Sequence, residues 1–226
     1  VDIISDVIVA TSKLPINDRL EEYVKSLNID CFRGEEEDVL SRFYHISQER
    51  NFDYVIRFTG DNPVIDTAYL KQFINNLLKK KLDYSCSTNL PLGCNFEMIK
   101  IDQLNLAYKT TKKAYDREHV TPFIKNTAKN IELYSFKGFR LIKQLRLTVD
   151  YPSDYAFVQM VFLSLRNKDI SLNKINKLIN NCPWLLEINK DNFQKKEYQN
   201  IEQEIKELLP LLKERELIRV HKFLSN

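Results

Sequence analysis

Apolar residues along most of the chain recur with two spacings in turn, and this alternation predicts strands that are each followed by a helix. Runs rich in β-branched and aromatic residues predict strands near 6–10, 30–32, 53–58, 83–87, 95–100, 131–136 and 144–148. Apolar residues spaced three or four apart predict helices near 17–27, 37–50, 67–79, 101–114 and 117–128, with two more beginning at Pro152 and Ser171. The alternation indicates an α/β fold with a largely parallel sheet.

Polar residues stand where several of these helices begin. Asn17, Asp66 and Ser171 each precede a helical pattern, and they are predicted N-caps because their side chains can accept a hydrogen bond from the first turn. Pro152 is predicted at the first position of its helix, where a missing N–H removes no helical hydrogen bond.

The composition changes near residue 187, where Lys, Glu, Gln and Asn become frequent. An apolar stripe at helical spacing follows, made of Ile201, Ile205, Leu208 and Leu212. Pro210 predicts a kink, or a second helix that begins there. We therefore expect a domain at residues 1–186 and a helical extension at residues 187–226. The stripe either packs on the chain's own domain or forms a contact in a homodimer.

Charge and cysteine content exclude several classes of function. The net charge is only +3, from 34 basic and 31 acidic residues, so the broad basic surface of a nucleic-acid-binding protein is not expected. No apolar run approaches the roughly 18 residues that a membrane span needs. The four cysteines form no C-x-x-C pair and have no histidine nearby at metal spacing, which argues against zinc and disulfides and fits a reducing cytoplasm.

The turn after the predicted strand at 53–58 carries the strongest chemical signal. Gly60-Asp61-Asn62-Pro63 stands at the carboxyl end of this strand, which is where open α/β sheets bind ligands. Gly60 permits a tight turn, and the turn aims the carboxylate of Asp61 outward, as a ligand of a hard cation must be aimed. The alternative is an ordinary strand-to-helix turn in which Asp66 caps the next helix.

Five segments in order share a pattern with a known family. They are Ala10-Thr11-Ser12, Cys31-Phe32-Arg33-Gly34 with Asp38 to Phe43, Arg57 to Asp66, Arg117 to Ile124, and Leu145 to Asp150. This series resembles the cytidylyltransferases that make CMP-activated sugar acids. It is most similar to the spore-coat polysaccharide biosynthesis branch, which is related to the acylneuraminate cytidylyltransferases and CMP-Kdo synthetases. The resemblance covers about residues 6 to 185.

The resemblance implies a three-layer α/β fold of the nucleotide-diphospho-sugar transferase (GT-A-like) type, with a mostly parallel mixed sheet. It implies transfer of CMP from CTP to a sugar acid in the cytoplasm for surface polysaccharide or glycoconjugate synthesis, with Mg²⁺ as cofactor. The family's metal-binding positions match Asp61 and Asp150, and Arg57 joins them as a catalytic residue. The nucleotide-binding positions match Thr11, Ser12, Arg33, Gly34, Arg42 and Gly60. The substrate-binding positions match Asn95, Glu97, Arg117, Glu118, His119 and Arg146.

Several of these residues also have a purely structural interpretation. Asp150 could cap the helix at Pro152. Arg57 and Arg146 are charged residues inside apolar strands, so they could pair with carboxylates of the chain instead of with phosphate or substrate. The segment 117–119 could form a structural network. Asn95 stands where relatives carry an acidic residue, so one charge is missing from the implied sugar site.

Relatives begin with a strand and a loop of the type A-R-x-G-S-x-R-L-P, and no segment here matches that loop. The four glycines stand alone, and none belongs to a phosphate-binding motif. We therefore expect that the first strand and the phosphate loop are missing, that the sheet has a gap with two unpaired edges, and that residues 1–226 do not turn over CTP by themselves.

Two other functions are compatible with the pattern. A glycosyltransferase of related fold would consume a nucleotide sugar and usually carries an Asp-x-Asp metal motif, whereas Asp61 is followed by Asn62-Pro63. A catalytically silent scaffold subunit would need no phosphate loop.

Overall fold

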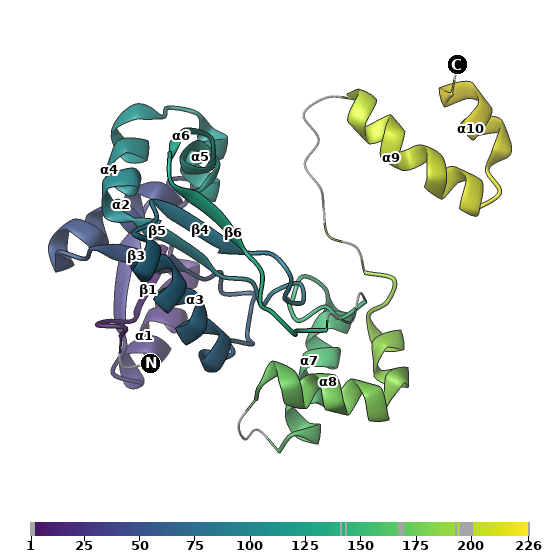
Figure 1. Cartoon of the computed structure of the whole chain (residues 1–226), viewed down its shortest axis with the longest axis horizontal. Coiled ribbons are helices and arrows are strands. Elements are labelled where there is room, and N and C mark those ends of the chain that lie inside the picture. Colours follow the sequence, from purple (N-terminus) through teal and green to yellow (C-terminus); the bar gives the residue numbers. More distant parts are fainter. Residues whose placement is uncertain are drawn as a thin grey trace. The chain divides into compact units, whose positions relative to one another are not determined.

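The computed structural model of the chain describes residues 3–140, 142, 144–166, 170–192, 194 and 201–225 (Figure 1). It divides into two compact units, Val1–Lys190 and Asp191–Asn226. The sequence placed this division at residue 187. The first unit extends beyond the 3-10 helix η2 (Pro183–Ile188), and Asn189 belongs to it, since its buried side-chain amide donates to Asp154.

In the described part of the first unit, six strands form two sheets. They are β1 (Ile8–Ser12), β2 (Asp30–Gly34), β3 (Tyr54–Arg57), β4 (Tyr84–Ser87), β5 (Glu97–Lys100) and β6 (Ile131–Tyr134). β1 and β2 pair in parallel. The second sheet has the order β3-β5-β4-β6, with β5 antiparallel to both neighbours and β4 parallel to β6. Among the described residues, β1 pairs only with β2 and β3 only with β5, so the strands form two sheets, and this division matches the gap expected from the sequence.

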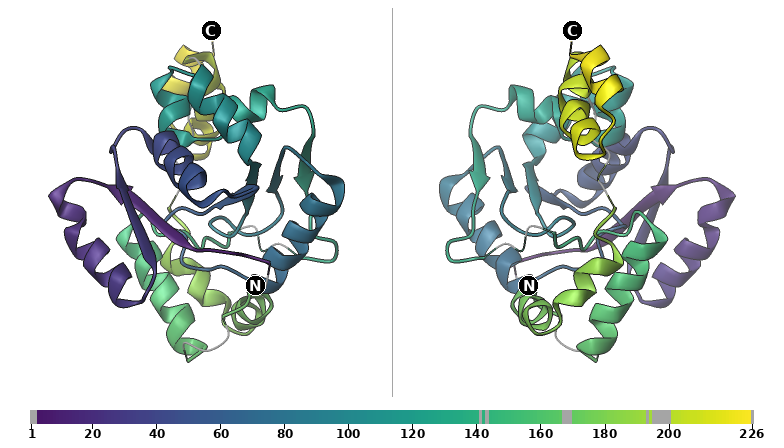
Figure 2. Two further views of the ribbon diagram at one scale, coloured as in Figure 1. Left: turned by 90° about the vertical axis from the view of Figure 1, so that its left-hand side faces the viewer. Right: turned by 90° about the vertical axis from the view of Figure 1, so that its right-hand side faces the viewer.

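Helices connect and cover these strands. The first unit contains η1 (Pro15–Asn17), α1 (Asp18–Ser26), α2 (Val39–Arg50), α3 (Thr67–Lys80), α4 (Ile101–Thr110), α5 (Ala114–His119), α6 (Pro122–Thr127), α7 (Pro152–Ser164) and α8 (Leu172–Asn181). The second unit contains α9 (Ile201–Glu214) and α10 (Ile218–Leu224). α7 and α8 lie side by side in both views of Figure 2.

The four-stranded sheet buries both of its faces, which makes the first unit a three-layer structure. Successive strand residues point to opposite faces, and the two cores follow this alternation. Ile56 and Met98 pack with Phe73 of α3 and with side chains of α7 and α8. Val55 and Ile99 pack on the other face, with side chains of α2, α4 and α6. The α/β class and the mixed sheet predicted from the sequence are therefore confirmed.

Two predicted elements are wrong. The helix expected at 117–128 is interrupted after His119, because Val120 has a φ of +67° and Pro122 begins a new helix at its first position. The strand expected at 144–148 forms no ladder in the described residues. Its one bridge joins Arg146 to Leu92, in the loop between β4 and β5.

The predicted N-caps have different outcomes. Ser171 accepts a hydrogen bond from the Lys174 amide as expected. Asn17 occupies the N-cap position of α1 but makes no capping bond, because its side-chain amide donates to the Ser12 hydroxyl at 2.6 Å.

Asp66 caps two helices at once. One carboxylate oxygen accepts from the Ala68 and Tyr69 amides at 3.0 and 3.2 Å, which caps α3 as predicted. The other accepts from the Leu172 amide at 2.9 Å, at the start of α8. Since the residue is only 4% exposed, these bonds form away from water. One buried carboxylate thus ties together helices that are more than a hundred residues apart in sequence.

The second unit is a pair of helices. α9 continues through Pro210, so a second helix does not begin there as the sequence suggested, and the next helix starts at Ile218. The Leu217 amide donates to the Leu212 carbonyl at 2.8 Å in the turn between them. Leu212 is buried, while Ile205 and Leu209 are half-buried.

We expect Asp66→Ala to lower the free energy of unfolding by about 2–4 kcal/mol, because three buried amides lose a charged acceptor. Urea denaturation followed by circular dichroism measures this change. Asp102→Asn is the matched control, since Asp102 is exposed and pairs with Lys100, and it should change stability by less than about 0.5 kcal/mol. Equal, small effects of both substitutions would contradict the double-cap interpretation.

Candidate functional site

The turn after β3 lies beside the segment that carries Asp150. The Asn62 amide donates to the Thr59 carbonyl at 3.1 Å and closes the turn. The Asp61 carbonyl in turn accepts from the Val149 amide at 2.8 Å. Two segments separated by almost ninety positions are therefore joined by a backbone hydrogen bond next to both candidate carboxylates.

The two carboxylates differ in their surroundings. Asp61 is exposed, and its side chain has no hydrogen-bond or ion-pair partner among the described residues. The Asp150 side chain is half-exposed and accepts from an Arg146 guanidinium nitrogen at 3.0 Å. Asp61 is therefore free to bind a cation, and Asp150 is held in place by its neighbour.

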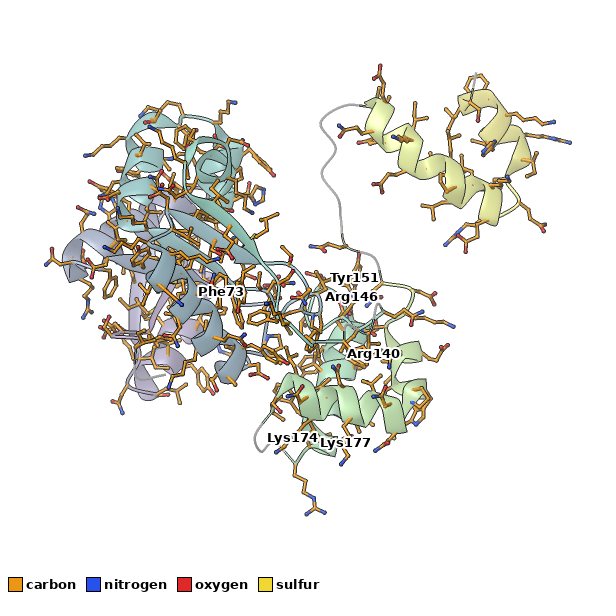
Figure 3. All side chains as sticks on the ribbon, in the orientation of Figure 1. Phe73, Arg140, Arg146, Tyr151, Lys174 and Lys177 are labelled. Atoms are coloured by element: carbon orange, nitrogen blue, oxygen red, sulfur yellow. The ribbon has the colours of Figure 1, made fainter. Side chains whose placement is uncertain are left out.

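Arg146 is itself fixed by a buried carboxylate. Asp154 is 0% exposed, and its two oxygens accept from the Arg146 Nε and Nη2 atoms at 3.2 and 3.1 Å. Burial disfavours the arginine's charge, but the hydrogen bonds that Arg146 donates to Asp154, together with the charge of the nearby Asp150, raise the pKa of Arg146 above its ordinary value. The guanidinium carbon lies 6.0 Å from the centre of the Tyr151 ring (Figure 3). Asp154 thus orients Arg146, and Arg146 orients Asp150.

Further bonds complete this cluster. An Asp154 oxygen also accepts from the backbone amides of Asp150 and Tyr151, both at 3.2 Å. The Asn189 side-chain amide donates to the other oxygen at 2.9 Å. The alternative in which Asp150 caps α7 is wrong, because Tyr151 occupies the N-cap position and Asp154 accepts the bonds there.

The loop between β4 and β5 supports the same segment. The Leu147 amide donates to the Leu92 carbonyl at 2.8 Å. A Cβ atom at Gly93 would lie 2.6 Å from the Thr148 nitrogen and 2.7 Å from the Leu147 carbonyl carbon. Gly93 also has a φ of +90°, which residues with a side chain rarely adopt. Only glycine therefore allows the loop to approach the segment that leads to Asp150.

A second charged cluster forms around Glu97 of β5. Its carboxylate accepts from Arg57 at 3.1 Å, from the Tyr84 hydroxyl at 2.7 Å and from Lys125 at 2.7 Å. Burial raises the pKa of Glu97, but Lys125 and the hydrogen bond from Tyr84 outweigh it and hold the pKa below its ordinary value. Two cations thus surround one ionised carboxylate, and Arg57 has the carboxylate partner that its structural interpretation required.

Four of the six residues assigned to the nucleotide lie at the carboxyl ends of β1 and β2, namely Thr11, Ser12, Arg33 and Gly34. Arg33 pairs with Asp18 at 2.8 Å and with Glu21, and its Nε donates to the Ser12 carbonyl at 2.5 Å. The Ser12 hydroxyl accepts from the Asn17 side chain and from the backbone. Thr11, next to it, is buried. Arg33 and Ser12 therefore shape this end of the sheet through contacts within the chain.

Arg42 retains unused hydrogen-bonding capacity. It donates to the Ala10 and Glu36 carbonyls at 3.1 and 3.3 Å, while its Nε is buried without an acceptor. No carboxylate of the described residues lies within ion-pair distance of it, and burial lowers its pKa. Gly34 permits this placement, because a Cβ there would lie 2.5 Å from the Arg42 Cγ.

The sequence suggested that the tight turn after β3 depends on the conformational freedom of Gly60, and the structure does not support this. The Gly60 backbone is not in the left-handed region, and a Cβ would meet no atom within 4 Å. The turn therefore does not require glycine for steric reasons within the chain. The space beside Gly60 is open, next to the exposed Asp61.

The residues assigned to the sugar site are only partly brought together. Asn95 closes its own loop: its side chain accepts from the Ser87 hydroxyl at 3.0 Å and donates to the Leu90 carbonyl at 3.1 Å. Glu97 lies in the cluster described above. This loop closure gives Asn95 a structural role, because a carboxylate at this position could not donate to the Leu90 carbonyl.

Arg117 connects the segment 117–119 to the start of α2. It pairs with Asp38, donates to the Tyr108 carbonyl at 3.1 Å and lies 4.8 Å from the centre of the Tyr108 ring. Glu118 is exposed without a partner among the described residues. The His119 ring lies edge-on to the Tyr115 ring at 4.5 Å. The structural-network alternative thus describes Arg117 well.

The donor set fits a divalent cation that also binds phosphate. In the part of the chain that the structure describes, no group of three or more His, Cys, Asp or Glu side chains could enclose a metal ion. Magnesium is commonly held by one or two carboxylates together with substrate phosphates. Two carboxylates match that kind of site: that of Asp61, which is exposed and has no partner among the described residues, and that of Asp150, whose segment is joined to Asp61 by a backbone hydrogen bond.

No described helix is long and apolar enough to cross a bilayer.

Some residues of these clusters had not been identified from the sequence. Asp154 carries a signal that could have shown it, since an acidic residue three positions after Tyr151 with Pro152 between them is typical of a helix N-terminus. Lys125, Tyr84 and Asn189 carry no such signal, because only the fold brings them to their partners.

Comparisons with known proteins agree on one family. The family profile described as cytidylyltransferase matches residues 2–205. An uncharacterised protein of Methanocaldococcus jannaschii is 31% identical over 206 residues, covering 88% of this chain and 83% of that protein. The spore coat polysaccharide biosynthesis protein SpsF of Bacillus subtilis is 28% identical over 182 residues, covering 79% of this chain and 76% of SpsF.

Two solved structures have a similar fold. A cytidylyltransferase from Leptospira borgpetersenii superposes with a TM-score of 0.74 at 22% identity, covering 84% of this chain and 81% of that chain. A CMP:2-keto-3-deoxy-manno-octonic acid synthetase solved with CTP superposes with a TM-score of 0.51 at 12% identity, covering 71% of this chain and 82% of that chain. Both comparisons confirm the predicted fold type.

Gly93→Ala should lower the free energy of unfolding by about 1–3 kcal/mol, because the new side chain meets backbone atoms and the positive φ is strained. Gly60→Ala is the matched control, since its side chain would meet no atom of the chain, and it should leave stability unchanged or slightly raised. Thermal and urea denaturation measure both variants. If the Gly93→Ala variant has the same stability as the unaltered protein, the close approach of Gly93 to residues 147–148 is not needed for stability.

Glu97 should make stability depend on pH in the acidic range. Its pKa is lowered in the folded protein from the ordinary 4.5, so its charge stabilises the fold above that value and the contribution is lost as pH falls through the folded-state pKa. Glu97→Gln should therefore destabilise the protein by about 1–3 kcal/mol at neutral pH, and the difference should shrink in acid. Glu187→Gln, at an exposed pair, is the control. A constant difference across pH would contradict the assignment.

Proposed function

The chain belongs to the cytidylyltransferase family, and from this premise we propose that it transfers CMP from CTP to the anomeric hydroxyl of a sugar acid. The sugar hydroxyl oxygen forms a bond to the α-phosphorus of CTP. The bond from that phosphorus to the oxygen bridging to the β-phosphate breaks, and pyrophosphate leaves. The hydroxyl proton passes to solvent. Both reactants are anions, so the barrier arises mainly from charge repulsion and from positioning.

The observation that carries this proposal is the pairing of the Asp61 turn with the Asp150 segment. An exposed carboxylate without a partner lies at the end of β3, and a backbone hydrogen bond of 2.8 Å joins its residue to Val149. The Arg146–Asp154 pair fixes the carboxylate of Asp150, the residue directly after Val149. Two carboxylates on adjacent segments are the arrangement that a cation bound to a triphosphate requires.

Asp61 and Asp150 would hold Mg²⁺, which when bound neutralises phosphate charge and favours ionisation of the attacking hydroxyl. The protein's own groups would supply the other contacts to the nucleotide. Arg42, with a buried Nε that has no acceptor, offers a donor near the carboxyl ends of β1 and β2. Gly60 leaves open space beside the turn, which allows a ligand to approach the backbone.

Relatives support the choice of acceptor. SpsF is named for spore coat polysaccharide biosynthesis, and the CMP:2-keto-3-deoxy-manno-octonic acid synthetase is named for a sugar-acid product. From these names we propose that this chain also uses a sugar acid as substrate and acts in surface polysaccharide synthesis. The charged cluster of Arg57, Glu97 and Lys125 supports it, since its two cations exceed its one carboxylate and would attract an anionic sugar.

The remaining assignments are also proposals. A cytoplasmic location is supported by the four cysteines, which are all free thiols. The homodimer is supported by the apolar stripe of α9, in which Ile201 and Leu208 are exposed. The expectation that residues 1–226 by themselves do not turn over CTP stays a prediction.

In the complete protein, Asp61→Asn should lower the rate of CMP transfer by about 10²–10⁴-fold, because a several-kcal/mol loss of transition-state charge stabilisation converts to that factor. Pyrophosphate release with CTP, Mg²⁺ and a panel of sugar acids measures the rate. Circular dichroism should show an unchanged fold, since Asp61 has no side-chain partner to lose.

Glu22→Gln serves as the control, because it removes an exposed carboxylate of α1 to which the proposal gives no role. It should retain full activity. If the folded Asp61→Asn variant transfers CMP at a near-normal rate, Asp61 has only a structural role in the turn. If the unaltered protein releases no pyrophosphate with any of the sugar acids, the proposed acceptor is wrong.

A further inference from the structure

Val120 has a backbone conformation that a β-branched residue rarely adopts. Its φ is +67° and its ψ is −51°, and the Thr121 amide donates to the His119 carbonyl at 2.7 Å. These features define a three-residue γ-turn of the strained kind. Asn51 and Lys81, which also have positive φ, lie in the ordinary left-handed region at helix ends. Val120 is thus held in a conformation that its side chain disfavours.

The residue after Val120 is also in an unfavourable conformation. Thr121 lies in the α region, with a φ of −93° and a ψ of −18°, and the ring of a following proline disfavours that region. Pro122 follows directly and begins α6. Two consecutive disfavoured conformations therefore connect α5 to α6, which lie side by side in Figure 1.

Contacts in the core keep this turn in place. Val120 is fully buried in the core that also contains Leu104 and Ile124. Its amide donates to the Asp116 carbonyl at 3.0 Å, and the Asp116 carboxylate accepts from the Thr111 hydroxyl at 2.6 Å. A strained conformation persists only where the surrounding contacts determine it, and such conformations cluster at functional sites.

The turn brings two donors to one carboxylate oxygen. Glu97 Oε1 accepts from the Thr121 hydroxyl at 3.3 Å and from Lys125 Nζ at 2.7 Å. Thr121 and Lys125 lie one helical turn apart, and the Lys125 amide donates to the Thr121 carbonyl at 2.9 Å. The start of α6, which the turn at Val120 fixes, therefore determines where the Lys125 ammonium lies.

Lys125 is held by buried groups, yet it remains accessible. Its ammonium nitrogen lies 5.7 Å from the centre of the ring of Tyr84, which is fully buried. The Lys125 side chain is 45% exposed, whereas that of Arg57, the other cation on Glu97, is 20% exposed. An ammonium group has three N–H donors, and one donates to Glu97. The other two can reach a second carboxylate.

We propose that Lys125 binds the carboxylate of the sugar acid, and that the strained turn at Val120 positions it for this contact. This inference rests on the proposed function. One carboxylate of the chain faces two cations in this cluster, so the carboxylate of the substrate would balance the remaining positive charge. Lys125 would then select acids over neutral sugars, because a neutral sugar leaves that charge without a partner.

The first test compares substrates in the complete protein. Lys125→Met should raise the KM for the sugar acid about 10- to 100-fold, as expected for the loss of a hydrogen bond between charged groups, and leave the KM for CTP unchanged. When the carboxamide replaces the sugar acid, the unaltered protein should show the same rise, and Lys125→Met should show no further one. Lys125→Arg should recover most of the affinity, because it retains the charge.

Lys79→Met is the matched control, since it changes an exposed lysine of α3 to which the proposal gives no role, and both KM values should stay the same. An unchanged KM for the sugar acid in folded Lys125→Met would overturn the assignment while CMP transfer stands. Equal KM values for acid and carboxamide in the unaltered protein would do the same. If CMP is transferred to no sugar acid, the proposed function fails, and this assignment fails with it.

The second test measures strain in the turn and needs no substrate. Val120→Gly and Val120→Ala both remove the buried side chain, so their comparison isolates the backbone. Because glycine adopts a positive φ readily, Val120→Gly should unfold at a higher urea concentration than Val120→Ala. Ala107, fully buried in the same core but within α4, is the control. Ala107→Gly should unfold at a lower urea concentration than the unaltered chain.

The same turn variant connects strain to substrate binding. In the complete protein, Val120→Gly should raise the KM for the sugar acid at least about threefold and leave that for CTP unchanged, because a relaxed turn no longer holds Lys125 in place. If Val120→Ala is more stable than Val120→Gly, the turn stores no strain and the positioning role is wrong. If Val120→Gly changes both KM values equally, the turn has a structural role only.

Discussion

The buried ion pair between Arg146 and Asp154 is the contact on which the candidate site depends most. A carboxylate that is fully enclosed must be neutralised and saturated with hydrogen bonds, and Asp154 achieves this with one arginine, one asparagine and two backbone amides. The same arginine reaches Asp150. The requirement to satisfy one buried charge thus fixes a half-exposed carboxylate at the surface.

Most basic side chains near the site already have acidic partners in the chain. Arg33, Arg57 and Arg117 each pair with a carboxylate. These pairs join β2 to α1, β3 to β5, and α5 to the start of α2. A ligand that carries several negative charges must therefore use the groups that remain, which are Arg42, open backbone and a bound cation. In the proposed function, the exposed carboxylate of Asp61 would bind a cation and so bring positive charge to the phosphates without a permanent side-chain cation.

Much of this arrangement could be predicted from the sequence, because local signals determine it. The strand before the Asp61 turn and the cap at Asp66 follow from apolar patterning and from the residue types at the strand end. The family resemblance, and not the strand pattern, implied that the 61 and 150 segments lie close together, since the strand expected at 144–148 forms only one bridge. The partners of Glu97 could not be predicted, since Tyr84 and Lys125 reach it only through the pairing of β4 with β5 and the placement of α6. The segment at 144–148 has the composition of a strand, yet it forms only one bridge, because the loop at Leu92 and Gly93 occupies its edge.

The central claim is that Asp61 and Asp150 share one cation on a nucleotide triphosphate. A crystal structure of the complete protein with CTP and Mn²⁺, with anomalous scattering recorded at the manganese edge, tests it most directly. The account predicts an anomalous peak within about 2.6 Å of a carboxylate oxygen of each residue and of phosphate oxygens. A peak that contacts neither carboxylate, in a crystal where CTP is bound, would contradict the claim.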